Sequence, residues 1–188
     1  MHLSTVLPRR RETLRAFGLF LAATALSTTA VLAGGQFKSG GGTWGSDLTV
    51  FGLATGLGKN LLLTVNADAT GLAPAVCRNN GGNVAPGQVG LPVGGSGQGF
   101  LTSTQNGRAS GITNEILPTF GGSPPGPDQA GCPNPNWTVD PQPDATRVDW
   151  RSVHVEGVLA NGSFITMELV CTTSFRNDGT TFGTCVRQ

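Results

Sequence analysis

The sequence predicts an all-β protein, an antiparallel β-sandwich of the immunoglobulin-like or a related type, with glycine- and proline-rich loops and two disulfides. Three observations predict this class. Short runs of residues alternate between apolar and polar side chains. Turn-forming residues separate these runs, a pattern typical of sandwiches and barrels. Beyond residue 33, no stretch keeps helical spacing for three turns.

The expected strands follow one another along the chain. The clearest is 163–173, where Ile165, Met167 and Leu169 alternate with partly apolar residues, so this strand is expected to be central. Asn106-Gly107 and Asn161-Gly162 predict two-residue hairpin turns. The proline-rich residues 118–143 predict a long loop. Further strands are expected at 47–54, 60–70, 72–78, 89–93, 100–104, 109–117, 148–159 and 181–187.

Residues 1–33 predict a signal peptide. Four arginines at 9–11 and 15 precede an apolar run over 16–32, and small residues at Val31 and Ala33 precede a cleavage site before Gly34. We therefore expect a secreted, extracellular protein. A retained membrane anchor and a twin-arginine signal are the alternatives for this segment.

The mature chain is expected to be one domain. We expect residues 34–46 to form a flexible, glycine-rich leader and residues 47–188 a single β-sandwich domain. The whole chain has 12 basic and 11 acidic residues. Without four arginines and Glu12 these counts become 8 and 10, a net charge of −2. This balance argues against nucleic-acid or membrane partners and leaves an unknown protein or glycan partner, with no oligomeric state predicted.

The four cysteines predict two disulfides, because an even number in an exported chain is typically paired. The turn sequence 176–180 is centred on residue 178, so an antiparallel hairpin would place Cys171 opposite Cys185. That pairing leaves Cys77 with Cys132. No CxxC motif is present and His154 is the one histidine after the signal, so neither a metal nor another cofactor is expected.

Two segments carry a resemblance to a known group of proteins. They are C-R-N-N-G-G-N-V-A-P-G-Q at 77–88 and C-P-N-P-N-W-T at 132–138. The chain resembles small secreted bacterial proteins of unassigned function that contain C-x-N-x-G-G-N-x-x-P-G-Q followed by C-P-N-x-N-W-T. The resemblance implies that Cys77 and Cys132 belong together. That group usually lacks the second cysteine pair, so Cys171 and Cys185 depart from it.

No catalytic residue is expected. His154 is interpreted as an outward-facing, partly solvated side chain. A two-residue turn at Asn161-Gly162 pairs residues whose numbers sum to 323, which would place Glu156 and Glu168 on opposite faces. That placement argues against a glycosidase carboxylate pair. The segment 56–59 lacks the full phosphate-loop pattern and is expected to be a turn.

Trp44 and Trp150 are the candidate ligand-stacking residues, on the expectation that they are exposed. Trp137 is expected to pack against the disulfide of Cys132. Four aspartates around the proline-rich loop could hold calcium, but their spacing fits no calcium motif and favours solvated loop charges (Asp128, Asp140, Asp144 and Asp149).

These observations predict a secreted, non-enzymatic structural or interaction module of the cell surface or medium. The first alternative is a carbohydrate-binding module that uses exposed Trp44 or Trp150. The second is a secreted hydrolase that depends on His154.

Overall fold

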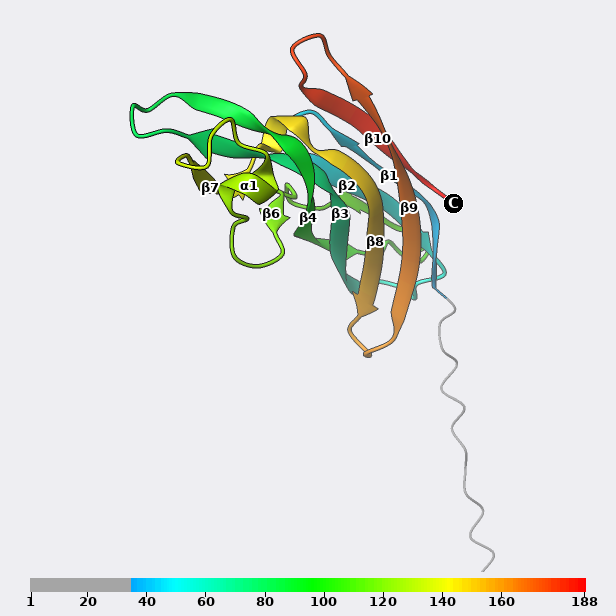
Figure 1. Ribbon diagram of the computed structural model, residues 1–188. Coiled ribbons are helices and arrows are strands. Elements are labelled where there is room, and N and C mark those ends of the chain that lie inside the picture. The colour runs from blue at the N-terminus through cyan, green and yellow to red at the C-terminus, as the bar shows by residue number, and fades with distance from the viewer. Residues whose placement is uncertain (1–34) are drawn as a thin grey trace, which may run out of the picture. The chain divides into compact units, whose positions relative to one another are not determined.

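The computed structural model describes residues 35–188, and the predicted signal peptide lies outside this range. Its elements are almost all strands (Figure 1). None of the helices in the described range is long and apolar enough to span a membrane. The elements are β1 (Gln36–Trp44), β2 (Leu48–Thr55), β3 (Leu62–Arg78), β4 (Val84–Thr102), β5 (Ala109–Ile112), β6 (Thr119–Phe120), α1 (Pro127–Ala130), β7 (Thr138–Pro143), the 3₁₀ helix η1 (Ala145–Arg147), β8 (Asp149–Leu159), β9 (Phe164–Phe175) and β10 (Thr181–Arg187).

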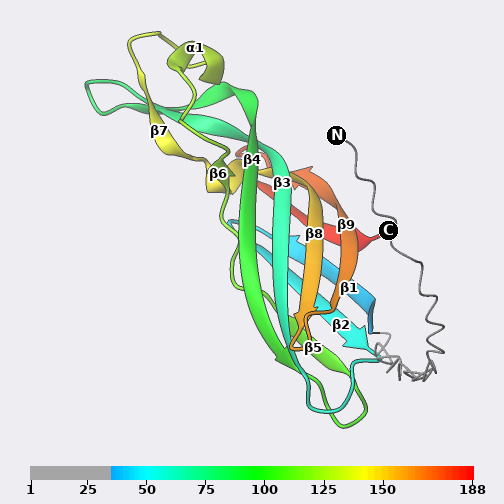
Figure 2. The same ribbon diagram turned by 90° about the horizontal axis from the view of Figure 1, so that it is seen from below.

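The described strands form one antiparallel sheet in the order β5-β2-β1-β10-β9-β8-β3-β4-β6, with β7 paired to β3. The sheet curls until the chain after β5 joins its two ends. Thr113 N–H donates to Val50 O of β2 at 2.8 Å, and Asn114 N–H donates to Gln98 O of β4 at 3.0 Å. Figure 2 looks onto β4, β3, β8 and β9, with β1 and β2 behind them. The all-β prediction is confirmed, whereas a sandwich is not, because the strands belong to a single sheet.

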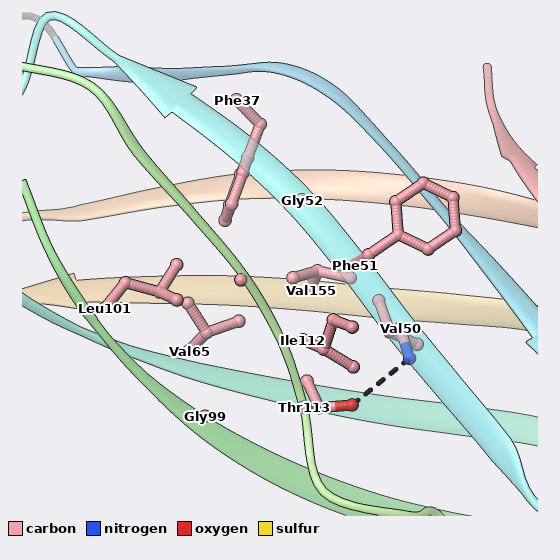
Figure 3. A pocket seen from close by; sticks show the side chains of 11 residues that line it. Phe37, Val50, Phe51, Gly52, Val65, Gly99, Leu101, Ile112, Thr113 and Val155 are labelled. Carbon is pink, nitrogen blue, oxygen red and sulfur yellow. Dashed lines mark hydrogen bonds between the residues drawn. The ribbon is translucent and has the colours of Figure 1, made fainter.

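The inner face of this sheet forms the core. Leu63 and Val65 of β3, Val153 and Val155 of β8 and Leu169 of β9 are all buried, because every second residue of a strand points to the same face. The interior is filled. Its cavity, drawn in Figure 3, measures about 10 Å³, close to the minimum of about 10–15 Å³ that one water needs. Room for a ligand is therefore confined to the surface of the described residues.

The glycine-rich residues 87–99 belong to the long strand β4, whereas the sequence predicted only two short strands here, at 89–93 and 100–104. Glycine is required where the segment 112–117 crosses β4 closely. A Cβ atom on Gly95 would lie 2.5 Å from Leu117 O, and one on Gly99 would lie 2.9 Å from Ile112 O. These glycines therefore allow the chain to pass over β4 and place Ile116 in the core.

The expectation of a flexible leader at 34–46 is wrong for Gln36–Trp44, which forms β1 between β2 and β10. Its glycines are packing positions and not flexible ones. A Cβ atom on Gly40 would lie 2.6 Å from Met167 Sδ, and one on Gly41 would lie 2.9 Å from Cys185 O. Neighbouring strands fill the space that side chains would occupy, which composition alone could not indicate.

Four hairpin loops share one three-residue design with glycine in the last position (80–82, 105–107, 160–162 and 177–179). In the β8–β9 loop, Leu159 N–H donates to Ser163 O at 2.8 Å and Gly162 has a φ of 82°. The two-residue turns predicted at 106–107 and 161–162 are therefore wrong by one residue. The loop centred on residue 178 is confirmed, and it pairs Cys171 with Cys185.

Asp178 stabilises the β9–β10 loop. Its Oδ1 accepts hydrogen bonds from Thr180 Oγ1 at 2.7 Å and from Thr180 N at 2.9 Å. These bonds favour the ionised carboxylate, so they lower the pKa of Asp178 below its ordinary value of 3.8. The contribution of this carboxylate to the free energy of unfolding is fully present above its ordinary pKa, and it is lost as pH falls through the lowered pKa.

Gly162→Ala should destabilise the protein by about 1–2 kcal/mol, because an L-residue is strained in the left-handed region. A Cβ atom at position 162 would meet nothing within 4 Å, so the backbone strain is isolated. Urea unfolding measures the change. Gly121→Ala is the control, since its Cβ is also unobstructed and its φ lies outside the left-handed region. Equal stability losses in the two variants would contradict this account.

Candidate functional site

The Cys77–Cys132 disulfide joins two segments that lie 55 residues apart in sequence, with a Cα–Cα distance of 5.8 Å. β7 reinforces the junction, because Thr138 pairs with Arg78 and Val139 with Cys77. β7 and α1 lie beside the far end of the β3–β4 hairpin in both ribbon views (Figures 1 and 2). We call residues 75–88 of the hairpin, together with residues 126–143, the distal arm. The disulfide thus unites the two motif segments identified in the sequence.

The distal arm has its own small apolar cluster. Ala75, Cys77 and Ala130 are fully buried, but they do not belong to the main core. Gly87 permits close packing there, because a Cβ atom on it would lie 2.3 Å from Ala130 O. A cluster built from alanines and a disulfide buries little apolar area, so we expect the covalent bond to contribute much of the local stability.

Hydrogen bonds shape the two loops at the end of the distal arm. Asn79 Oδ1 accepts from Asn83 N at 2.9 Å, and Asn134 Oδ1 accepts from Asn136 N at 2.9 Å. Trp137 N–H then donates to Asn134 O at 3.1 Å. Each of these two asparagines uses its side-chain oxygen to fix a turn, which leaves its NH₂ group as a donor for other partners.

The two loops line an open surface pocket of about 260 Å³, here named the Asn–Trp pocket. Its lining contains four amide side chains, one glycine and one indole, from Asn79, Asn80, Gly81, Asn134, Asn136 and Trp137. No lining side chain carries a charge. The neighbouring Arg78 is paired with Asp140 at 3.2 Å. The Asn–Trp pocket therefore offers hydrogen-bond donors and acceptors beside an aromatic surface, without a net charge.

The structure corrects the expected exposure of two of the tryptophans. Trp44 and Trp150 are 6% and 1% exposed, so the prediction that they are exposed ligand-stacking residues is wrong. Both point to the inner face of the sheet, and Trp44 lies against Gly183, where an added Cβ would be 2.6 Å from its ring. Trp137, expected to be packed, is half-buried and lines the Asn–Trp pocket.

His154 lies in a separate groove on the outer face of β3, β4 and β8. Its side chain is 45% exposed, which confirms an outward-facing histidine. Its Nδ1 contacts Glu168 Oε1 of β9, and the strand register places Asp68 on its other side. The groove measures about 530 Å³ and is lined by Asn66, Asp68, Ser96, Gly97, Gln98, His154 and Glu156.

The expectation that Glu156 and Glu168 face opposite sides is wrong. The three-residue loop pairs residues whose numbers sum to 322, so Glu156 lies opposite Thr166 and His154 opposite Glu168. A shift of one residue turns every side chain of a strand to the other face. The two carboxylates therefore share the outer face with His154.

Three of the four aspartates of the proline-rich region are engaged in other contacts. Asp144 pairs with Arg147 at 3.4 Å, Asp149 pairs with Arg151 at 3.4 Å, and Asp140 pairs with Arg78. Within residues 35–188, no group of three or more histidine, cysteine or acidic side chains could hold a metal ion. The segment 56–59 connects β2 to β3, as expected of a turn, with Leu57 buried in the core.

The four asparagines of the Asn–Trp pocket were not identified as site residues from the sequence. Each motif places asparagines within four residues of a cysteine, and this repetition was the available signal. Once the cysteines are paired, these asparagines must lie near one another. The pairing of Cys77 with Cys132 was predicted, but whether the asparagines line one pocket depends on which way each loop turns.

No family model matches the chain, and no curated protein or solved structure is significantly similar to it.

Replacing both Cys77 and Cys132 with alanine should loosen the distal arm while the main core stays folded. The chain-entropy model assigns about 4 kcal/mol to a loop of this length. Hydrogen exchange should therefore accelerate at the amides of Asn83 and Trp137 and stay slow in β8 and β9.

The comparison is the double variant Cys171→Ala/Cys185→Ala. This disulfide joins β9 to β10 against the main core, so its loss should lower global stability by about 3 kcal/mol. If loss of Cys77–Cys132 instead accelerated exchange equally in the distal arm and in the core, the apolar cluster of the distal arm would not be separate from the main core.

Proposed function

We propose that the protein is an exported, non-enzymatic interaction module that recognises its partner at the Asn–Trp pocket. The observation that carries this proposal is the covalent union of two distant loops whose amide and indole side chains line one pocket. Such a site is formed before a ligand arrives. Preorganisation improves affinity, because fewer groups must be ordered on binding.

The two disulfides support the assignment to an exported protein. Disulfides form and persist in oxidising compartments, and no cysteine of this chain is free. The signal peptide predicted at residues 1–33 points to the same location. The module would then act at the cell surface or in the medium.

The chemistry of the lining favours recognition over catalysis. General acid–base catalysis needs a group that gains or loses a proton near the working pH. Asparagine side chains and indole do not titrate in this range. They can orient a bound molecule by hydrogen bonding and contact, which is what an interaction module requires.

The tryptophans provide a direct test of this proposal. The chain has three, and only Trp137 lines the Asn–Trp pocket, so the indole N–H resonance of Trp137 should report on its occupancy. The probes are neutral oligosaccharides, uronic acid oligosaccharides, and neutral and basic peptides. We expect one class to shift the Trp137 resonance, while Trp44 and Trp150 serve as buried internal controls.

Trp137→Phe assigns the resonance, and Trp137→Ala should weaken binding at least tenfold. The proposal fails if no probe class shifts the Trp137 signal, or if a probe binds wild type and Trp137→Ala with equal affinity.

A hydrolase is the second candidate, favoured by the contact between His154 and Glu168 in an open groove. A carboxylate that orients a histidine is one part of many catalytic triads. Among the hydrogen bonds of residues 35–188, Glu168 is the one side-chain partner of His154, and no serine supplies the nucleophile position.

A screen of ester, glycoside and peptide substrates tests this candidate. If the groove is catalytic, His154→Ala should reduce activity by about 10²–10⁴-fold, the usual contribution of a general base. Thr166→Ala is the control, because Thr166 is exposed in the adjacent row of the same face. Equal activity in wild type and His154→Ala would remove His154 from any mechanism.

A further inference from the structure

We infer that the ligand of the Asn–Trp pocket is a neutral carbohydrate, bound through a single terminal or branching sugar ring. The inference rests on the proposed function of this site and adds the chemical class of its ligand. It is drawn from three properties of the pocket: the hydrogen-bonding character of its lining, its charge and its size.

The lining matches the hydrogen-bonding character of sugar hydroxyls. A hydroxyl both donates and accepts, and an asparagine side chain offers one carbonyl oxygen and two N–H donors. Asn80 and Asn136 are exposed, and neither side chain takes part in the turn hydrogen bonds formed by Asn79 and Asn134. These four amides thus supply donors and acceptors from both loops, which suits several hydroxyls on the edge of one ring.

Trp137 supplies the contact that amides cannot. A sugar ring has a face of C–H groups in addition to its hydroxyl edge, and an indole provides a flat apolar surface of similar size. Trp137 is half-buried, so it has both support from the protein and surface open to the pocket. Its backbone N–H is bonded to Asn134 O at 3.1 Å, which fixes the loop that carries it. The stacking surface therefore lies beside the amides that would bind the hydroxyls.

The charge of the lining favours a neutral ligand. Binding an ion costs solvation energy unless an opposite charge receives it. No lysine, arginine or acidic side chain lines the Asn–Trp pocket, and the neighbouring Arg78 is already paired with Asp140. Phosphate, sulfate, uronate and ammonium groups would therefore find no opposite charge there, whereas hydroxyl groups need none.

The pocket is small and open. Its volume of about 260 Å³ lies just below the range of about 300–1,000 Å³ typical of sites for drug-sized ligands. Several lining residues are exposed, so the pocket is open on its outer side and the remainder of a longer glycan could extend into solvent. The site would thus recognise a chain end or a branch.

The experiment titrates the full mature chain with neutral gluco-, manno-, galacto- and N-acetylglucosamine oligosaccharides and follows the Trp137 indole resonance. Uronic acid oligosaccharides and neutral peptides are the comparison probes. We expect at least one neutral oligosaccharide to bind, and we expect Asn80→Ala, Asn136→Ala and Trp137→Ala each to lower its affinity tenfold or more. The resonances of Trp44 and Trp150 check that each variant is folded.

Asn106→Ala is the matched control. Asn106 is an exposed asparagine in another three-residue hairpin loop and lies outside the Asn–Trp pocket. Its removal should leave the affinity unchanged. An equal loss of affinity in Asn106→Ala and Asn136→Ala would overturn the inference.

The remaining outcomes separate this inference from the proposed function. If a peptide or a uronic acid oligosaccharide shifts the Trp137 resonance and no neutral sugar does, the ligand class is wrong while the recognition site stands. If neutral sugars bind without affecting Trp137, the pocket is not their site and the inference fails. If no probe of any class shifts Trp137, both the inference and the proposed function fail.

Discussion

The arrangement of the sheet depends on the length of its hairpin loops. Each of the four three-residue loops ends in a glycine with positive φ, and the β8–β9 and β9–β10 loops fix the register of the strands that they join. Register decides which face every side chain occupies. With this register, Met167 and Leu169 enter the core, while His154 and Glu168 meet on the outer face. One residue more or fewer in the β8–β9 loop would exchange these faces.

The filled interior leaves room for ligands at the surface, as in the distal arm. The segment 112–117 closes the sheet over glycines of β4, and its packing leaves a cavity of about 10 Å³. The distal arm differs from the rest, because alanines and a disulfide replace the large apolar side chains of the core. The Cys77–Cys132 bond, together with the pairing of β7 with β3, thus holds the loops of the Asn–Trp pocket together.

Several features were predictable because they depend on local patterns. Alternating residues identified most strands, and the symmetry of the turn about residue 178 identified the Cys171–Cys185 pair. Other predictions failed where packing against neighbouring strands decides the local structure. Residues 36–44 form a strand by pairing with β2 and β10, and Met167 and Cys185 fill the space beside Gly40 and Gly41. An Asn-Gly pair can end a three-residue loop as readily as it forms a two-residue turn, so the dipeptide did not fix the register of β8 and β9.

The sequence by itself determined most of the strands, the approximate positions of the turns and the cysteine pairs, because alternation, turn formation and residue spacing are local properties of the chain. The tertiary structure decided which tryptophan is open to solvent and where the asparagines of the two motifs meet. Burial of Trp44 and Trp150 depends on sheet closure, and the Asn–Trp pocket depends on two loops joined across 55 residues. Both are properties of distant segments in contact, which no local pattern specifies.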